Sequence, residues 1–247
     1  MDAPAPSFVD AVSRRLLLLL VIAAEIFGLL ALILTSLWAG YYSTPGFQWT
    51  STGMMNLHPF VMTLGMVFVF GNALITYRVL SRLSVQRKVI KALHGALMLA
   101  VAVCTGLGIY FAVAHAHSTG YSGFNSFHGM IGLSTIALFG LQFIFAAAIF
   151  VCPMSPQWIR KAYMRTHAFF GTLAFTLAAA TSFSGMQWST DFGLLTGPAA
   201  VYLSAGFFMV TFVVTVIYIL SRDQYQAIRP DPTINQSLIN KDVVGDA

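Results

Sequence analysis

The stretch that decides the fold is residues 92–114, which read ALHGALMLAVAVCTGLGIYFAVA. It holds one histidine and no Asp, Glu, Lys or Arg, and its apolar character is continuous instead of alternating. A helix needs about 20 predominantly apolar residues to cross a hydrocarbon core roughly 30 Å thick. Because lipid offers no hydrogen bonds, a spanning segment must satisfy its own backbone groups, which favours a helix. Residues 92–114 therefore predict a transmembrane helix.

Comparable runs occur on both sides of this stretch, and together they predict an all-α integral membrane bundle of six helices. The expected helices are Leu16–Gly40, Leu57–Tyr77, Ala92–Ala114, Phe127–Val151, Thr166–Met186 and Pro198–Leu220. We expect one domain over residues 16–220, with polar tails over residues 1–15 and 221–247.

The composition agrees with a membrane protein. Of 247 residues, 57% are hydrophobic and 9% are charged, whereas a soluble domain carries about 25% charged residues. This excludes an ordinary soluble enzyme and a nucleic-acid-binding protein, despite the formal net charge of +5. Two cysteines cannot form a disulfide framework.

The basic residues predict the orientation in the membrane. With six helices, all 13 fall on one side, and the connections near residues 41–56, 115–126 and 187–197 contain none. They are Arg14, Arg15, Arg78, Arg82, Arg87, Lys88, Lys91, Arg160, Lys161, Arg165, Arg222, Arg229 and Lys241. The positive-inside rule places that side, and both termini, in the cytosol.

Four of the six histidines lie near the beginnings of four consecutive expected helices. His58 and His128 begin helices on the non-cytosolic side, whereas His94 and His167 begin helices on the cytosolic side. The four therefore form two pairs of matched depth, one near each face. Two imidazoles that face each other without a thiolate or carboxylate suit axial ligation of a b-type haem, which would then transfer electrons. Small residues beside the pairs leave room for a flat macrocycle; they are Gly95, Gly129, Gly132 and Gly171.

Other interpretations of the histidines stay open at this point. A single intramembrane histidine often makes an interhelical hydrogen bond. The four together could instead line a proton or metal-ion transporter without haem, or belong to a structural or receptor-like membrane protein. Glu25 is the sole carboxylate within an expected helix, and we expect it to have a structural or dimer-contact role.

Several short motifs resemble the eukaryotic cytochrome b561 family. They are Asn56-Leu57-His58-Pro59, Ala73-Leu74-Ile75-Thr76-Tyr77-Arg78, Lys91-Ala92-Leu93-His94 and Ser126-Phe127-His128. The resemblance extends from about residue 16 to 222 and includes the order and spacing of the four histidines. It implies a usually homodimeric protein whose four central helices, the second to the fifth, hold two haems b. His58 and His128 would hold the non-cytosolic haem, and His94 and His167 the cytosolic one.

The same resemblance implies an oxidoreductase that takes electrons from cytosolic ascorbate. The acceptor would be monodehydroascorbate or a ferric iron chelate on the opposite side. We expect a multi-pass protein of the plasma membrane or of an endolysosomal, vacuolar or secretory-vesicle membrane.

Ascorbate is a monoanion, so its site should be cationic and close to the cytosolic haem. Lys91 and Arg87 lie three and seven residues before His94, and Arg160 lies seven before His167. All three match basic ascorbate-contacting positions in the family, although each could be a topology charge. Topology is the expected role of the other basic residues nearby, Lys88, Lys161 and Arg165.

The non-cytosolic loops contain no Lys or Arg, so an acceptor there must be held differently. His117 matches a family histidine implicated in this substrate site, and His115 is a second, weaker candidate. The alternative is that both are solvated loop histidines. The family often has Tyr and Trp near His128, where this chain has Asn125 and Met130.

Overall fold

The computed structural model describes residues 8–43, 45–120, 123–152, 154–188 and 197–225, and every regular element within these ranges is a helix. Six helical spans in them are long and apolar enough to cross a membrane, which confirms the predicted all-α membrane bundle. Most of the two expected tails, before residue 8 and after residue 225, lies outside the described residues.

Five of the six spans are longer than the apolar runs that predict them, and the fourth, Phe127–Val151, has the predicted bounds. The helices are α1 (Phe8–Leu37), α2 (Ser51–Met62), α3 (Phe70–Arg82), α4 (Arg87–Thr119), α5 (Phe127–Ala146), α6 (Gln157–Trp188) and α7 (Gly197–Ser221). Most spans continue beyond the apolar run at one or both ends, because a helix satisfies its own backbone in the polar interface as well as in lipid.

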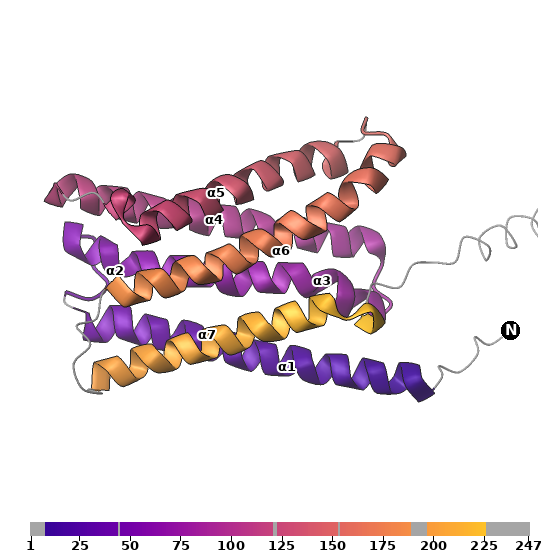
Figure 1. Ribbon diagram of the computed structural model, residues 1–247, viewed down its shortest axis with the longest axis horizontal. Helices are drawn as coiled ribbons and strands as arrows, with labels where there is room; N and C mark the ends of the chain where they lie inside the picture. Colours follow the sequence, from indigo (N-terminus) through magenta and orange to yellow (C-terminus); the bar gives the residue numbers. More distant parts are fainter. Residues whose placement is uncertain (1–7, 44, 121–122, 153, 189–196, 226–247) are drawn as a thin grey trace, which may run out of the picture.

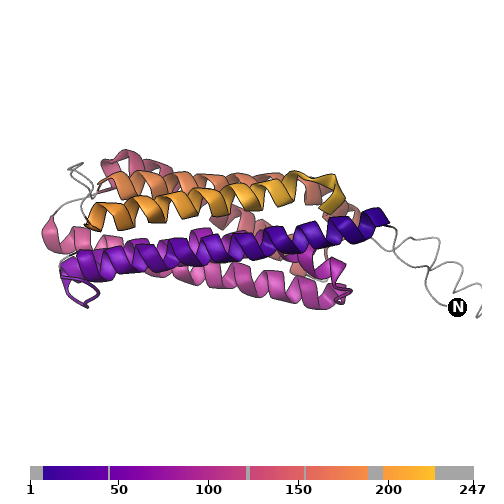
Figure 2. The same ribbon diagram turned by 90° about the horizontal axis from the view of Figure 1, so that it is seen from below.

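The helices lie side by side along the long axis of the molecule (Figure 1). The main packing partners are α1 with α7, α2 and α3 with α4, and α5 with α6. Figure 2 shows α1 and α7 running together along one flank. The remaining helices, α2 to α6, form the part of the bundle that carries the histidines.

The second span is divided into two α-helices, α2 and α3, by a π-helical segment, Thr63–Val69. Pro59 precedes this segment inside α2, where it cannot donate a backbone hydrogen bond. Gly65 lets α4 approach closely, since a Cβ there would lie 2.3 Å from the Cβ of Cys104. Such π-bulges change which faces of a helix point inward, and they are frequent at functional sites.

An aromatic layer fills the middle of the bundle. Phe70 of α3 contacts Phe139 of α5 and Phe175 of α6, with ring centroids 5.5 and 5.7 Å apart. Phe175 also contacts Phe212 of α7. All four rings are almost completely buried, and such edge-to-face pairs add to the stabilisation from burial. The layer separates the two ends of the bundle.

Two of the basic residues at one end of the bundle, Arg78 and Arg82, hydrogen-bond backbone carbonyls at the end of α7 and just after it. Arg78 donates to the carbonyls of Leu220 and Arg222 at 2.5 and 2.8 Å, and Arg82 donates to that of Gln224. The last carbonyls of a helix lack intrahelical partners, so cations there are favourable.

Candidate functional site

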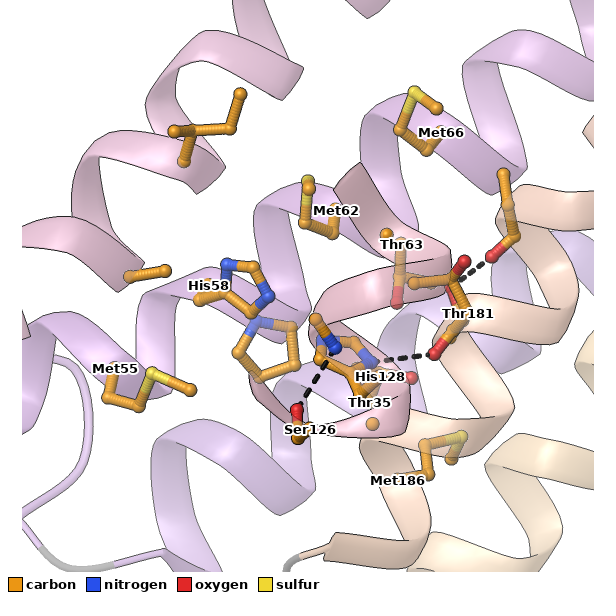
Figure 3. Close-up of a pocket in the computed structure, with 18 of the residues that line it drawn as sticks. Thr35, Met55, His58, Met62, Thr63, Met66, Ser126, His128, Thr181 and Met186 are labelled. Carbon is orange, nitrogen blue, oxygen red and sulfur yellow. Dashed lines mark hydrogen bonds between the residues drawn. The ribbon is translucent and has the colours of Figure 1, made fainter. Parts of the chain in front are cut away.

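His58 of α2 and His128 of α5 face each other at one end of the bundle (Figure 3). Their ring centroids are 6.1 Å apart. α5 begins just before His128, because the Ser126 hydroxyl caps the helix by accepting the backbone N–H of Gly129 at 3.0 Å. This cap fixes His128 in the first turn, opposite His58.

Each of these two rings is oriented by a backbone carbonyl from another helix. Nδ1 of His58 lies 2.8 Å from the Gly108 carbonyl oxygen, and Nδ1 of His128 lies 2.9 Å from that of Thr181. Because a carbonyl can only accept, Nδ1 carries the proton in both rings and Nε2 keeps its lone pair. This is how metal-binding histidines are usually held.

A cavity of about 450 Å³ surrounds this first pair. Its lining is mainly apolar and includes four methionines, Met55, Met62, Met66 and Met186 (Figure 3). The backbone of α6 approaches the His128 ring closely at Gly185, since a Cβ there would lie 2.6 Å from Cε1 of His128. An apolar pocket with a few convergent nitrogens is typical of a cofactor site.

His94 of α4 and His167 of α6 form a second pair, with ring centroids 6.2 Å apart. Nδ1 of His94 donates to the Ala73 carbonyl at 2.9 Å. Nδ1 of His167 differs from the other three, because it is buried without a hydrogen-bond partner among the described residues. The His167 ring contacts Phe150 and Tyr163, with centroids 5.3 and 6.0 Å away.

Both pairs have the spacing that an iron between two imidazoles requires. A metal held at about 2 Å from each of two ring nitrogens places the ring centroids roughly 6 Å apart, as in both pairs. The rings within each pair are nearly perpendicular, at 84° and 78°. The residues present therefore fit a bis-histidine haem at each end.

The two pairs lie far apart along the bundle. His94 and Gly108, whose carbonyl contacts His58, are 14 residues apart on α4. At 1.5 Å per residue this corresponds to roughly 21 Å along the helix axis. The structure thus brings His58 to His128 and His94 to His167, with the aromatic layer between the pairs.

The three basic residues expected to bind ascorbate gather near the second pair. Lys91 donates to the carbonyl of Phe150, and Arg160 donates to that of Cys152 at 2.9 Å. Both therefore meet at the end of the fourth span, next to the ring that contacts His167. Arg87 lies within electrostatic reach of Tyr77, whose ring contacts His94. The expected topology charges Lys88, Lys161 and Arg165 are exposed.

The structure separates the two histidines expected on the acceptor side. His115 is half-buried and lines the cavity, whereas His117 is exposed and is not among its lining residues. Ile109 and Ala112 line the same cavity. They and His115 are spaced three residues apart, so the three lie on one face of α4, and this face points inward. Position 117 is two residues from position 115 and faces away on a helix.

Sequence reasoning missed the groups that orient the histidines. The carbonyls of Gly108, Ala73 and Thr181 carry no signal in the sequence. Gln142 does have a signal in the sequence, because it is an amide inside an apolar run. In the structure its Nε2 donates to the His167 carbonyl at 2.5 Å. Glu25 joins neither pair; its carboxyl group hydrogen-bonds the side chain of Asn72 on α3.

Comparison with known proteins places the chain among membrane reductases. The family model for eukaryotic cytochrome b561 matches residues 57–193. The mouse lysosomal membrane ascorbate-dependent ferrireductase CYB561A3 is 31% identical over 215 residues, which cover 83% of this chain and 88% of the mouse protein. The bovine transmembrane ascorbate-dependent reductase CYB561 is 31% identical over 221 residues, or 87% of this chain and 86% of the bovine protein. The human CYB561A3 protein is 32% identical over 218 residues, or 84% and 88%.

Proposed function

The chain belongs to the eukaryotic cytochrome b561 family, and from this premise we propose that it moves electrons from cytosolic ascorbate through two haems b to a non-cytosolic acceptor. The acceptor is monodehydroascorbate or a ferric chelate. One observation carries the proposal: two imidazole pairs at bis-histidine spacing lie at opposite ends of one membrane-spanning bundle.

In this proposal His58 and His128 hold the non-cytosolic haem, and His94 and His167 hold the cytosolic one. When bound, such a haem would supply a reversible one-electron centre, and each would be held by the two histidines of its pair. The carbonyls of Gly108, Thr181 and Ala73 orient three of the four rings. The lining of the cavity around the first pair is mainly apolar.

Lys91, Arg87 and Arg160 form the proposed ascorbate site at the cytosolic end. Two of these cations are already ordered by backbone carbonyls at the end of the fourth span, so little side-chain entropy is lost when an anion binds. Lys91 contacts the carbonyl of Phe150, and the ring of Phe150 contacts that of His167. An ascorbate anion held there lies beside the His94–His167 pair.

On the acceptor side we propose that His115 is the principal polar group for the external substrate and that His117 has a secondary role. His115 lines the cavity together with His58 and His128. A neutral imidazole can bind a ferric chelate or pass on a proton near physiological pH.

We further propose that both termini face the cytosol, because the basic residues gather at one end of the bundle. The resemblance to the family also supports our proposal of a homodimer in the plasma membrane or in an endolysosomal, vacuolar or secretory-vesicle membrane. The relative from mouse is a lysosomal membrane protein.

The function is tested by spectroscopy and by electron transfer across the membrane of a liposome. Purified protein should show a dithionite-dependent α-band with two haems per chain. Liposomes that contain ascorbate inside should reduce external ferric chelate when the protein is present. The histidine-lined transporter would be supported instead if the protein lacks the α-band and conducts protons or divalent ions across the liposome membrane.

Replacing His115 by alanine should slow reduction of an external ferric chelate several-fold, because His115 lines the cavity at the first pair. Reduction of both haems by internal ascorbate should stay close to that of the parent protein. The measurement is the initial rate of chelate reduction by ascorbate-loaded liposomes.

His117→Ala is the matched control, because His117 is exposed and lies two residues after His115 on α4. It should change the rate less than His115→Ala does. A larger effect of His117→Ala would assign the acceptor site to the exposed face of α4 and contradict the role of the cavity.

A further inference from the structure

The buried face of α5 carries polar side chains at two levels of the membrane. Its buried residues are Thr135, Phe139 and Gln142, which recur every three or four positions and so share one face. Placing an amide or hydroxyl in an apolar interior is unfavourable unless it is hydrogen-bonded. Both polar residues should therefore have partners on the helix they face, which is α6.

Gln142 uses both ends of its amide to contact α6. Its Nε2 donates to the backbone carbonyl of His167 at 2.5 Å. Its Oε1 accepts the hydroxyl proton of Tyr163 at 2.8 Å. The two contacts join one side chain of α5 to two positions of α6 that are one helical turn apart.

Gln142 and Tyr163 both contact His167, which is the one of the four paired histidines whose ring has no carbonyl partner among the described residues. Nδ1 of His58, His94 and His128 bonds to a backbone oxygen, whereas Nδ1 of His167 is buried without a partner among the described residues. The His167 ring instead packs against Tyr163 and Phe150. Gln142 thus holds the main chain of His167 and also anchors the Tyr163 ring that contacts its imidazole.

We propose that Gln142 and Tyr163 are positioning residues that set the orientation of the His167 imidazole, in place of the carbonyl bond that orients the other three histidines. This inference rests on the proposed function of His167 as an axial ligand. Groups around an axial histidine tune the properties of the iron it binds. Gln142 and Tyr163 therefore tune the haem held by His94 and His167 and leave the other haem unaffected.

The structure offers a matched control at the opposite end of the same helix pair. The hydroxyl of Thr135 on α5 lies 3.3 Å from that of Thr181 on α6, and the Thr181 carbonyl accepts from His128. Thr135 is therefore the counterpart of Gln142 at the His58–His128 pair. Phe139 lies between the two polar levels and is buried in the aromatic layer.

The test compares Gln142→Leu, Tyr163→Phe and Thr135→Val in the full-length holoprotein. The readouts are the EPR spectrum of the ferric haems, which depends on the angle between the axial imidazole planes, and the midpoint potential of each haem. Signals are assigned with His58→Ala and His94→Ala proteins. Gln142→Leu and Tyr163→Phe should shift the EPR signal and midpoint potential of the His94–His167 haem and leave those of the other haem in place. Thr135→Val should leave the His94–His167 haem unchanged.

A double-mutant comparison strengthens the test. Gln142→Leu and Tyr163→Phe act on one network, so their combined shift should be smaller than the sum of the two, whereas Gln142→Leu and Thr135→Val should add. Equal shifts of both haems, or an unmoved His94–His167 haem in Tyr163→Phe protein, would overturn the inference. Tyr163→Phe removes one hydroxyl and keeps the ring, so it carries the test if Gln142→Leu protein does not fold. A parent protein without haem would overturn the proposed function instead.

Discussion

Replacing His58 or His128 by alanine should remove one haem per chain and leave the second haem spectroscopically intact. Replacing His94 or His167 should remove the other haem. The reason is the distance between the pairs: the rings within each pair are 6.1 or 6.2 Å apart, but the pairs lie roughly 21 Å apart along α4. A haem bound to one pair therefore has no ligand in common with the other.

The measurement is the haem-to-protein ratio together with the reduced-minus-oxidised spectrum of monodisperse protein. Each variant should retain about half of the haem of the parent. Transmembrane reduction of ferric chelate should fall to the background rate in all four, because an electron then meets a gap across half of the bundle. Loss of the same spectral component from His58→Ala and His94→Ala proteins would contradict the pairing.

Replacing Lys91 by alanine should raise the ascorbate concentration needed for half-reduction about tenfold to a hundredfold. A charge-assisted hydrogen bond to a bound anion contributes about 1.5–3 kcal/mol, and each 1.4 kcal/mol is about tenfold in affinity. Arg160→Ala should have an effect of the same order, because Arg160 donates to the carbonyl of Cys152, two residues after the Phe150 carbonyl that Lys91 contacts. The measurement is haem reduction as a function of ascorbate concentration.

Lys88→Ala is the control for charge alone. Lys88 is exposed on the same turn of α4, and its removal should change the ascorbate dependence by well under tenfold. Dithionite needs no binding site, so it should reduce both haems in every variant. Equal shifts for Lys88→Ala and Lys91→Ala would mean that these cations report topology and do not bind ascorbate.

The sequence predicts most of the architecture because the relevant signals are local. Continuous apolar runs such as residues 92–114 identify six spans, since lipid selects for length and apolarity within one segment. The spacing of His58, His94, His128 and His167 predicts their depths from helical rise alone. In the structure the ring of His58 lies beside that of His128, and the ring of His94 lies beside that of His167.

The rotation of each helix about its axis is decided by packing. His115 and His117 lie only two residues apart in the sequence, yet one lines the cavity and the other is exposed. The π-helical segment Thr63–Val69 changes the phase of the second span, and no pattern in those residues predicts it. Resemblance to the family alone therefore favours His117 as the acceptor-site residue, whereas the packing of α4 favours His115.

By itself the sequence determined six helices that are long and apolar enough to span a membrane, and it predicted the depth of four histidines. Only the tertiary structure decided which groups orient the rings: the carbonyls of Gly108, Ala73 and Thr181 for three of them, and Gln142 with Tyr163 for His167. The physical reason is that hydropathy and helical rise act within one segment. A hydrogen bond between helices depends on how two segments cross and rotate, and that is set by packing across the whole bundle.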